Sequence, residues 1–316
     1  MVKLSRDQNT VAFDEGVEIY SGIPYFPLTE SWSINIYFGK LVFKSLKNQL
    51  KKSILHYTTF GLPILSNNDD DIVTVHDLFF LEQGDEAHRK FFNVSEMILR
   101  RFLRFRNVVA PSFFIKRELE DYGFDGKIKV IYLPPQKGIN FMNDKISARK
   151  ILGLPMDKNL ILSVSSGLRR KNLKVVAEVM GNFDDKTSLV KVGYPLDGAY
   201  NFSSLESAKL NLIYNACDAF LFPSLKEGYG RPLVEAMASG LPAVVSDIQV
   251  FREICGRSAI FVEPTKDGCL LGLKEALNNP EQIGKEGLTR SKMFSRENFI
   301  NEVRSYYLSI ADQRGP

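Results

Sequence analysis

The chain of 316 residues has little cysteine, no long apolar run and no large excess of charge of either sign. Cys217, Cys255 and Cys269 are odd in number and lack metal-ligand spacing, so buried thiols in a reducing compartment are expected instead of a disulfide framework. No stretch approaches the ~20 apolar residues that cross a bilayer, and residues 1–7 hold no apolar signal-peptide core. These absences predict a cytoplasmic protein.

The bulk composition is that of an ordinary soluble globular protein. Hydrophobic residues make up 44% and charged residues 25%, and the length suffices for two domains. The net charge of +4 is mild, so no nucleic-acid partner is expected.

Segments of strand and helix character alternate along most of the chain, which indicates a doubly wound α/β fold. Two Rossmann-like halves with a cleft between them are the economical architecture. The expected strands are 54–58, 72–75, 108–110, 129–132, 160–164, 189–192, 218–222, 243–245 and 260–262. Helices are expected at 34–50, 87–105, 113–122, 172–180 and near the end of the chain, with a linker at 133–145.

The segment KEGYGRPLVEAMASGLP, residues 226–242, places two glutamates around a glycine turn. A buried strand precedes it, Pro232 suits the first position of a helix, and Gly240 suits the residue just past the helix end. The turn therefore lies at the carboxyl end of a parallel strand, where open α/β sheets bind ligands.

Glu227 and Glu235 flank this turn and can face one crevice, because Glu235 falls about one turn into the helix. A carboxylate can accept two hydrogen bonds from a vicinal diol, and the N–H groups near Gly228 and Gly230 suit an anion. Two diols with phosphate between them describe a nucleotide-sugar. The alternative is a solvated loop glutamate and a helix-surface glutamate.

The segment SGLRRKN, residues 166–172, puts three cations at the start of the helix expected at 172–180. The helix dipole disfavours positive charge there, and a broken local rule often marks a function. A diphosphate held by Arg170 and Lys171 would relieve the conflict, with Arg169 as a spare surface charge. The alternative is a solvated basic loop.

Two further segments lie around the strand expected at 72–75. His76 and Asp77 end it at a carboxyl edge, and such a pair in isolation is usually structural. The triplet Asp69-Asp70-Asp71 precedes the strand instead of ending it, so we expect a solvated turn and no metal site.

Residues 220–247, FLFPSLKEGYGRPLVEAMASGLPAVVSD, resemble the donor-site signature of family 4 retaining glycosyltransferases of the GT-B fold. Other segments follow the family's order: VTVHDL, VVAPSFFIKRELEDYG, KVIYLPP, VSSGLRRKNLKVV and AIFVEP. The resemblance covers roughly residues 72–310.

The resemblance implies a role for each matching residue. His76 would reach the donor sugar, with Asp77 beside it on the donor side, and Glu227 would contact the transferred sugar. Glu235 would hold the nucleotide ribose. The diphosphate would lie on Arg170 and Lys171, near the backbone of Gly228, Tyr229 and Gly230.

The resemblance also implies an activity and a domain organisation. The expected reaction moves a sugar from a nucleoside diphosphate sugar to an acceptor hydroxyl, with retention and without a metal or another cofactor. Residues 1–138 would form the acceptor-side domain and 139–295 the donor domain, and the helix at 296–316 would pack back toward the first. A GT-B phosphorylase, a nucleotide-sugar epimerase and a nucleotide-sugar-binding protein without turnover are the rivals.

Two groups of basic residues in the first half of the chain bear on how the acceptor is reached. The expected helix at 34–50 and its end carry Lys40, Lys44, Lys47 and Lys51 on one face, and Arg100, Arg101 and Arg104 form a second basic cluster. Solvated helix faces are one interpretation. The other is peripheral docking on an anionic membrane, with a glycan or lipid-linked acceptor.

Overall fold

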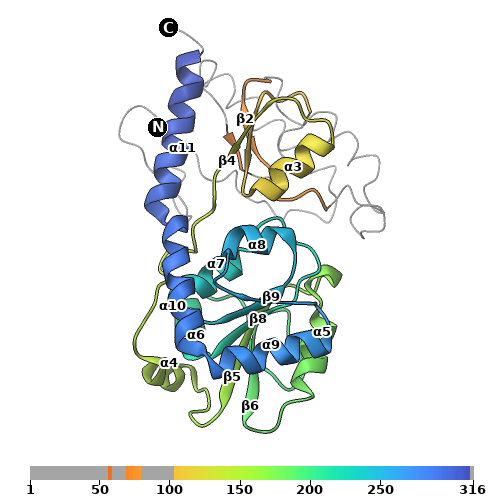
Figure 1. The fold of residues 1–316 in the computed structure, drawn as a ribbon. Coiled ribbons are helices and arrows are strands. Elements are labelled where there is room, and N and C mark those ends of the chain that lie inside the picture. Colours follow the sequence, from red (N-terminus) through yellow and green to blue (C-terminus); the bar gives the residue numbers. More distant parts are fainter. Residues whose placement is uncertain (1–55, 59–68, 80–102, 314–316) are drawn as a thin grey trace, which may run out of the picture. The chain divides into compact units, whose positions relative to one another are not determined.

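The computed structural model describes residues 56–58, 69–79 and 103–313 (Figure 1). The chain divides into two compact units: Met1–Ala110, Glu118–Lys129 and Val303–Pro316 form the first, and Pro111–Arg117 with Val130–Glu302 form the second. The domain boundaries expected after residues 138 and 295 stay predictions. Within the described ranges no helix is long and apolar enough to cross a membrane.

Several predictions fall on residues outside the described ranges. They are the helix at 34–50, most of the helix at 87–105, and the basic residues Lys40, Lys44, Lys47, Lys51, Arg100 and Arg101. Residues 103 and 104, which were expected to continue that helix, form a turn.

The first unit is built on a four-stranded sheet in the order β1–β2–β3–β4. The pairs β1–β2 and β2–β3 are parallel, as the alternating pattern predicts. The strands are β1 (His56–Tyr57), β2 (Ile72–Thr74), β3 (Asn107–Ala110) and β4 (Lys127–Val130), and helix α3 is Phe113–Asp121.

Two expectations for this part of the chain are wrong. The strand expected at 129–132 ends at Val130, because Tyr132 and Leu133 pack instead against the hydrophobic core of the second unit. The acidic triplet is not wholly solvated, since Asp71 is buried and the Tyr57 hydroxyl donates to its Oδ2 at 3.4 Å.

The second unit holds a six-stranded sheet in the order β10–β9–β8–β5–β6–β7, in which every pair is parallel. The strands are β5 (Asn159–Ser165), β6 (Thr187–Gly193), β7 (Tyr200–Phe202), β8 (Ala219–Phe222), β9 (Ala243–Ser246) and β10 (Ile260–Val262). The helices are α4 (Lys145–Leu152), α5 (Leu173–Met180), α6 (Ser207–Ala216), α7 (Arg231–Ala238), α8 (Gln249–Cys255), α9 (Lys266–Asn278) and α10 (Pro280–Ser291), with short 3₁₀ turns η3 (Arg169–Lys171) and η4 (Lys292–Phe294). The last helix, α11 (Arg296–Gln313), begins in the second unit, and its residues from Val303 onward belong to the first.

Helices cover both faces of this sheet, because successive side chains of its strands point to opposite faces. Leu162 and Phe220 join one core with residues of α6, α7 and α8, whereas Ile161 and Leu221 join a second core with residues of α5 and α9. The arrangement is the doubly wound one, and Figure 1 shows the helices on either side. The three cysteines are buried free thiols, as predicted.

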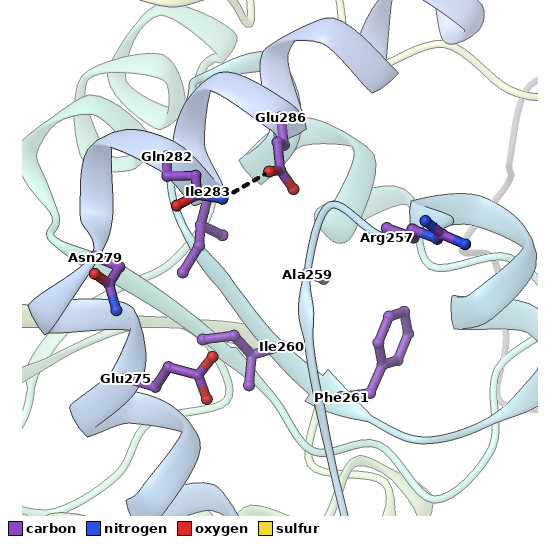
Figure 2. Close-up of a pocket in the computed structure, with 9 residues that line it drawn as sticks. All are labelled: Arg257, Ala259, Ile260, Phe261, Glu275, Asn279, Gln282, Ile283 and Glu286. Carbon is purple, nitrogen blue, oxygen red and sulfur yellow. Dashed lines mark hydrogen bonds between the residues drawn. The ribbon is translucent and has the colours of Figure 1, made fainter.

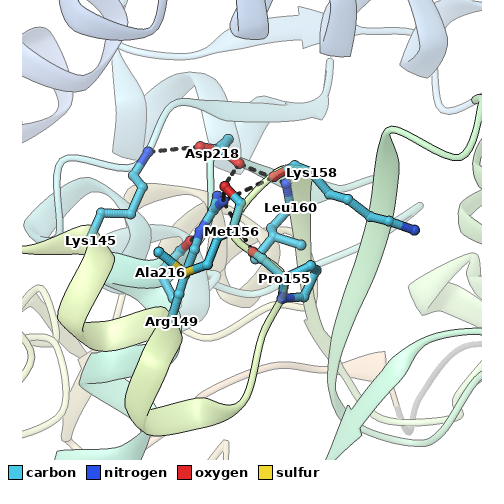
Figure 3. Close-up of polar contacts among 8 residues, drawn as sticks. All are labelled: Lys145, Arg149, Pro155, Met156, Lys158, Leu160, Ala216 and Asp218. Atoms are coloured by element: carbon cyan, nitrogen blue, oxygen red, sulfur yellow. Dashed lines mark hydrogen bonds and ion pairs between the residues drawn. The ribbon is translucent and has the colours of Figure 1, made fainter.

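A buried arginine anchors the amino edge of the sheet (Figure 3). The Arg149 side chain donates to the carbonyl of Ala216 at 2.8 Å and to that of Lys158 at 3.0 Å, and pairs with Asp218 at 2.6 Å. Lys145 binds the other oxygen of Asp218 at 2.8 Å. One side chain thus ties α4 to the starts of β5 and β8.

The segment 133–145 is irregular, but it is not a free linker. The amide of Asn140 donates to Asn211 at 3.0 Å, and the amide of Met142 donates to Asn215 at 2.7 Å. Because both partners lie on α6, this segment is fastened to the second unit.

Candidate functional site

The predicted cations and the first glutamate meet at the topological switch point of the six-stranded sheet. The chain runs from β5 outward to β6 and β7, then returns to place β8 on the other side of β5. The loop after β5 carries Arg170 and Lys171, and the loop after β8 carries Glu227. The crevice outside the carboxyl ends of parallel strands at such a point is where open α/β sheets bind ligands.

Both cations bind the same carboxylate. Arg170 Nη1 lies 3.2 Å from Glu227 Oε2, and Lys171 Nζ binds Glu227 Oε1. The side chain of Glu227 is 7% exposed, and those of Arg170 and Lys171 are 23% and 12% exposed. Arg170 and Lys171 are therefore partly buried and paired within the chain, whereas Arg169 is exposed.

The loops that carry these side chains are also joined through their backbones. The amide of Leu225 donates to the carbonyl of Arg170 at 2.8 Å, which fastens the β8 loop to the β5 loop. Asn172 ends η3 in the left-handed conformation (φ 55°), and its side chain donates to the carbonyl of Pro264 at 2.9 Å. Arg170 and Lys171 are thus held on a fixed backbone.

The glycine turn begins α7 as predicted. Gly230 has φ +93°, and a Cβ there would lie 2.8 Å from the Phe251 ring, so only glycine fits. The carbonyl of Gly228 accepts a hydrogen bond from Ser112 at 2.8 Å. The Tyr229 side chain is buried, and its hydroxyl donates to the carbonyl of Leu133 at 2.6 Å.

Glu235 lies in a network of its own. It is 4% exposed, and its Oε2 accepts from the Tyr214 hydroxyl at 2.9 Å. Its Oε1 accepts from the amide of Gln136 at 3.2 Å and lies 3.5 Å from Arg231 Nε. Burial raises the pKa of Glu235, while the hydrogen bond from Tyr214 and the charge of Arg231 lower it. Glu235 is therefore not a surface glutamate, and its role toward the ribose stays a prediction.

His76 and Asp77 belong to the first unit. They follow β2, as predicted, and the exposed His76 has its Nε2 3.0 Å from the carbonyl of Thr58. Their predicted roles toward a donor stay predictions.

The structure adds two residues that the motifs did not mark. Tyr214 is fully buried on α6 and supports Glu235. Lys191 is fully buried in β6, and its Nζ donates to the carbonyls of Ser165 (2.9 Å) and Val192 (2.8 Å). Burial lowers the pKa of Lys191 to about 8. The sequence signal for a buried lysine was its position inside the apolar run LVKVG, residues 189–193.

Glu253 has a structural role in this unit. Its carboxylate accepts from the amides of Phe113 at 2.7 Å and Phe114 at 2.9 Å, which caps the start of α3. It also helps to raise the pKa of Tyr132 to about 12, after the larger effect of burial.

A hollow of about 500 Å³ lies elsewhere, between β10, α9 and α10 (Figure 2). Its lining includes Arg257, Phe261, Glu275 and Glu286. None of the predicted site residues lines it.

The fold is that of known GT-B glycosyltransferases. A sucrose-phosphate synthase from Thermosynechococcus elongatus superposes with a TM-score of 0.75 at 19% identity, over 87% of this chain and 77% of that one. The Anabaena protein HepE, in a structure titled as a complex with UDP and glucose, gives a TM-score of 0.71 at 16% identity, over 85% and 81%.

Two family descriptions match the sequence: "Glycosyltransferase Family 4" over residues 4–134 and "Glycosyl transferases group 1" over residues 144–288. Between them they span most of the chain. The chain belongs to this family of GT-B glycosyltransferases.

Two curated relatives are named as O-antigen chain mannosyltransferases. The O-antigen chain mannosyltransferase RfbU of Salmonella typhimurium (strain LT2) is 27% identical over 259 residues, 73% of this chain and 66% of that protein. The O-antigen chain mannosyltransferase B of Escherichia coli is 30% identical over 102 residues, 31% of this chain and 27% of that protein. The matched part thus spans less than two thirds of either relative.

Proposed function

We propose that the protein transfers a sugar from a nucleoside diphosphate sugar to an acceptor hydroxyl, with retention of anomeric configuration and without a metal ion. One observation carries the proposal. Arg170 and Lys171 converge with Glu227 at the switch point of a parallel sheet, beside a glycine turn that begins a helix.

The residues divide the chemistry between them. Arg170 and Lys171 hold the diphosphate and stabilise the negative charge that it gains as it departs. In other enzymes a metal ion provides this stabilisation. Glu235 accepts from the ribose hydroxyls, and Glu227 acts at the sugar. The roles expected of His76 and Asp77 toward the donor sugar stay predictions.

The names of the relatives guide the choice of substrate. RfbU and mannosyltransferase B are mannosyltransferases of O-antigen chains, so a mannosyl donor is the first to test and a glycan or lipid-linked glycan is the acceptor class. Docking on an anionic membrane through the lysines from Lys40 to Lys51 is part of the same proposal, as is a cytoplasmic location.

A donor screen tests the function. Nucleotide release is followed with each nucleotide-sugar, with and without glycan acceptors, and with and without a chelator. Acceptor-dependent release that survives the chelator is expected. A requirement for inorganic phosphate would indicate a phosphorylase, donor conversion without acceptor an epimerase, and donor binding without turnover a binding protein.

A further inference from the structure

Glu227 already forms ion pairs with the two cations that would bind a diphosphate. The carboxylate has one oxygen on Arg170 and the other on Lys171, so both oxygens are engaged. The carboxylate is the most buried member of the cluster, since its side chain is only 7% exposed, against 23% for Arg170 and 12% for Lys171. A diphosphate that reaches these cations must therefore take the place of this carboxylate or share its hydrogen bonds.

Charge decides the outcome of that competition. Two cations share the one carboxylate of Glu227, and the start of α5 adds the positive end of a helix dipole. A diphosphate offers more charge and more acceptor oxygens than a carboxylate, so it can replace Glu227 with a net gain. A singly charged anion gains little, because it would exchange one charge for another.

We propose that Glu227 is an internal ligand of Arg170 and Lys171 that the diphosphate of the donor displaces, and that it thereby sets the affinity and the selectivity of this anion site. The inference rests on the proposed function. The same exchange frees the carboxylate for the sugar, which follows the diphosphate in the donor.

Removing a residue of a binding site usually weakens binding, but here the removal of the Glu227 charge should strengthen it. Glu227→Gln should bind a nucleoside diphosphate more tightly than the wild-type chain, by roughly threefold to thirtyfold, because one competing charge-assisted interaction is gone. Glycosyl transfer by the same variant should fall. Glu227→Asp keeps the charge but draws the carboxylate back by one methylene, so a smaller gain is expected.

Calorimetry with UDP, GDP and inorganic pyrophosphate tests the inference, after thermal melting has confirmed that each variant is folded. Glu178→Gln is the matched control, since it removes an exposed glutamate that pairs with Lys174 at 3.6 Å on α5. Its affinity should equal that of the wild type. In an Arg170→Ala/Lys171→Ala background, Glu227→Gln should change the affinity by less than about twofold.

Two results would overturn the inference and leave the proposed function standing. One is wild-type binding of a nucleoside diphosphate with equal or weaker binding by Glu227→Gln. The other is a full gain that persists without Arg170 and Lys171. If the wild-type chain binds none of the probes, the proposed function itself fails.

Discussion

The hydroxyl of Tyr214 donates to Oε2 of Glu235 at 2.9 Å, between two side chains that are almost fully buried. This hydrogen bond lowers the pKa of Glu235 against the larger, raising effect of burial. The other groups that face the carboxylate are the Arg231 guanidinium and the amide of Gln136. The ionisation of Glu235 therefore depends on a residue that lies outside the motif.

Replacing Tyr214 by phenylalanine should raise the pKa of Glu235 further. A protonated carboxyl accepts fewer hydrogen bonds from the ribose, so nucleoside diphosphate binding should weaken at a higher pH than in the wild type as the solution is acidified. Calorimetry across the acid and neutral range measures this shift. Tyr306→Phe, which alters another buried tyrosine, is the control, and an equal shift there would contradict the assignment.

The two glutamates should differ in their kinetic effects. Glu235→Ala removes ribose contacts that are equal in ground and transition states, so it should mainly raise KM for the donor. Glu227→Gln should mainly lower kcat, because its sugar contact is exerted during transfer. Steady-state kinetics separates the two, and a pure KM effect of Glu227→Gln would remove its role in turnover.

Arg149→Met should destabilise the second unit by about 3–5 kcal/mol, because Asp218 and several carbonyls lose a buried partner. Lys145→Met removes the half-exposed partner of the same carboxylate and should cost at most about 1 kcal/mol. Denaturant unfolding measures both. Equal losses would show that Arg149 is no more important than its exposed neighbour.

Lys191 gives the stability a pH dependence. The pKa of the Lys191 ammonium is about 8 in the folded chain and near 10.5 in the unfolded chain. Between these two pH values the unfolded chain binds one more proton than the folded chain. The stability of the wild type relative to Lys191→Met should therefore rise with pH from about 8 toward 10.5 and stay flat below. Unfolding free energies at several pH values check the slope, and a constant difference would contradict it.

Much of the second unit could be predicted because its signals are local. The apolar runs at 160–164 and 243–245 and the Pro232 and Gly240 boundaries fix strands and a helix by short-range rules. The concentration of cations at Arg170 and Lys171 also pointed to the loop where the two side chains meet Glu227. The sequence could not show that Glu227 is their partner, since that pairing depends on how β8 returns beside β5.

Other features depend on contacts between distant segments. Tyr214 reads as an ordinary apolar helix residue until α6 packs against α7 and its hydroxyl meets Glu235. The end of β4 at Val130 is set by the burial of Tyr132 and Leu133 in the second unit, which no local preference reveals.

The central proposal is that Arg170 and Lys171 bind the diphosphate of the donor, and calorimetry of Arg170→Ala/Lys171→Ala tests it most directly. Each charge-assisted hydrogen bond contributes about 1.5–3 kcal/mol, but Glu227 competes for the same two cations, so the loss of both side chains should weaken nucleoside diphosphate binding by roughly several-fold to a hundredfold. Arg169→Ala, which removes an exposed cation of the same loop, should have little effect. Unchanged affinity in the double variant would contradict the account.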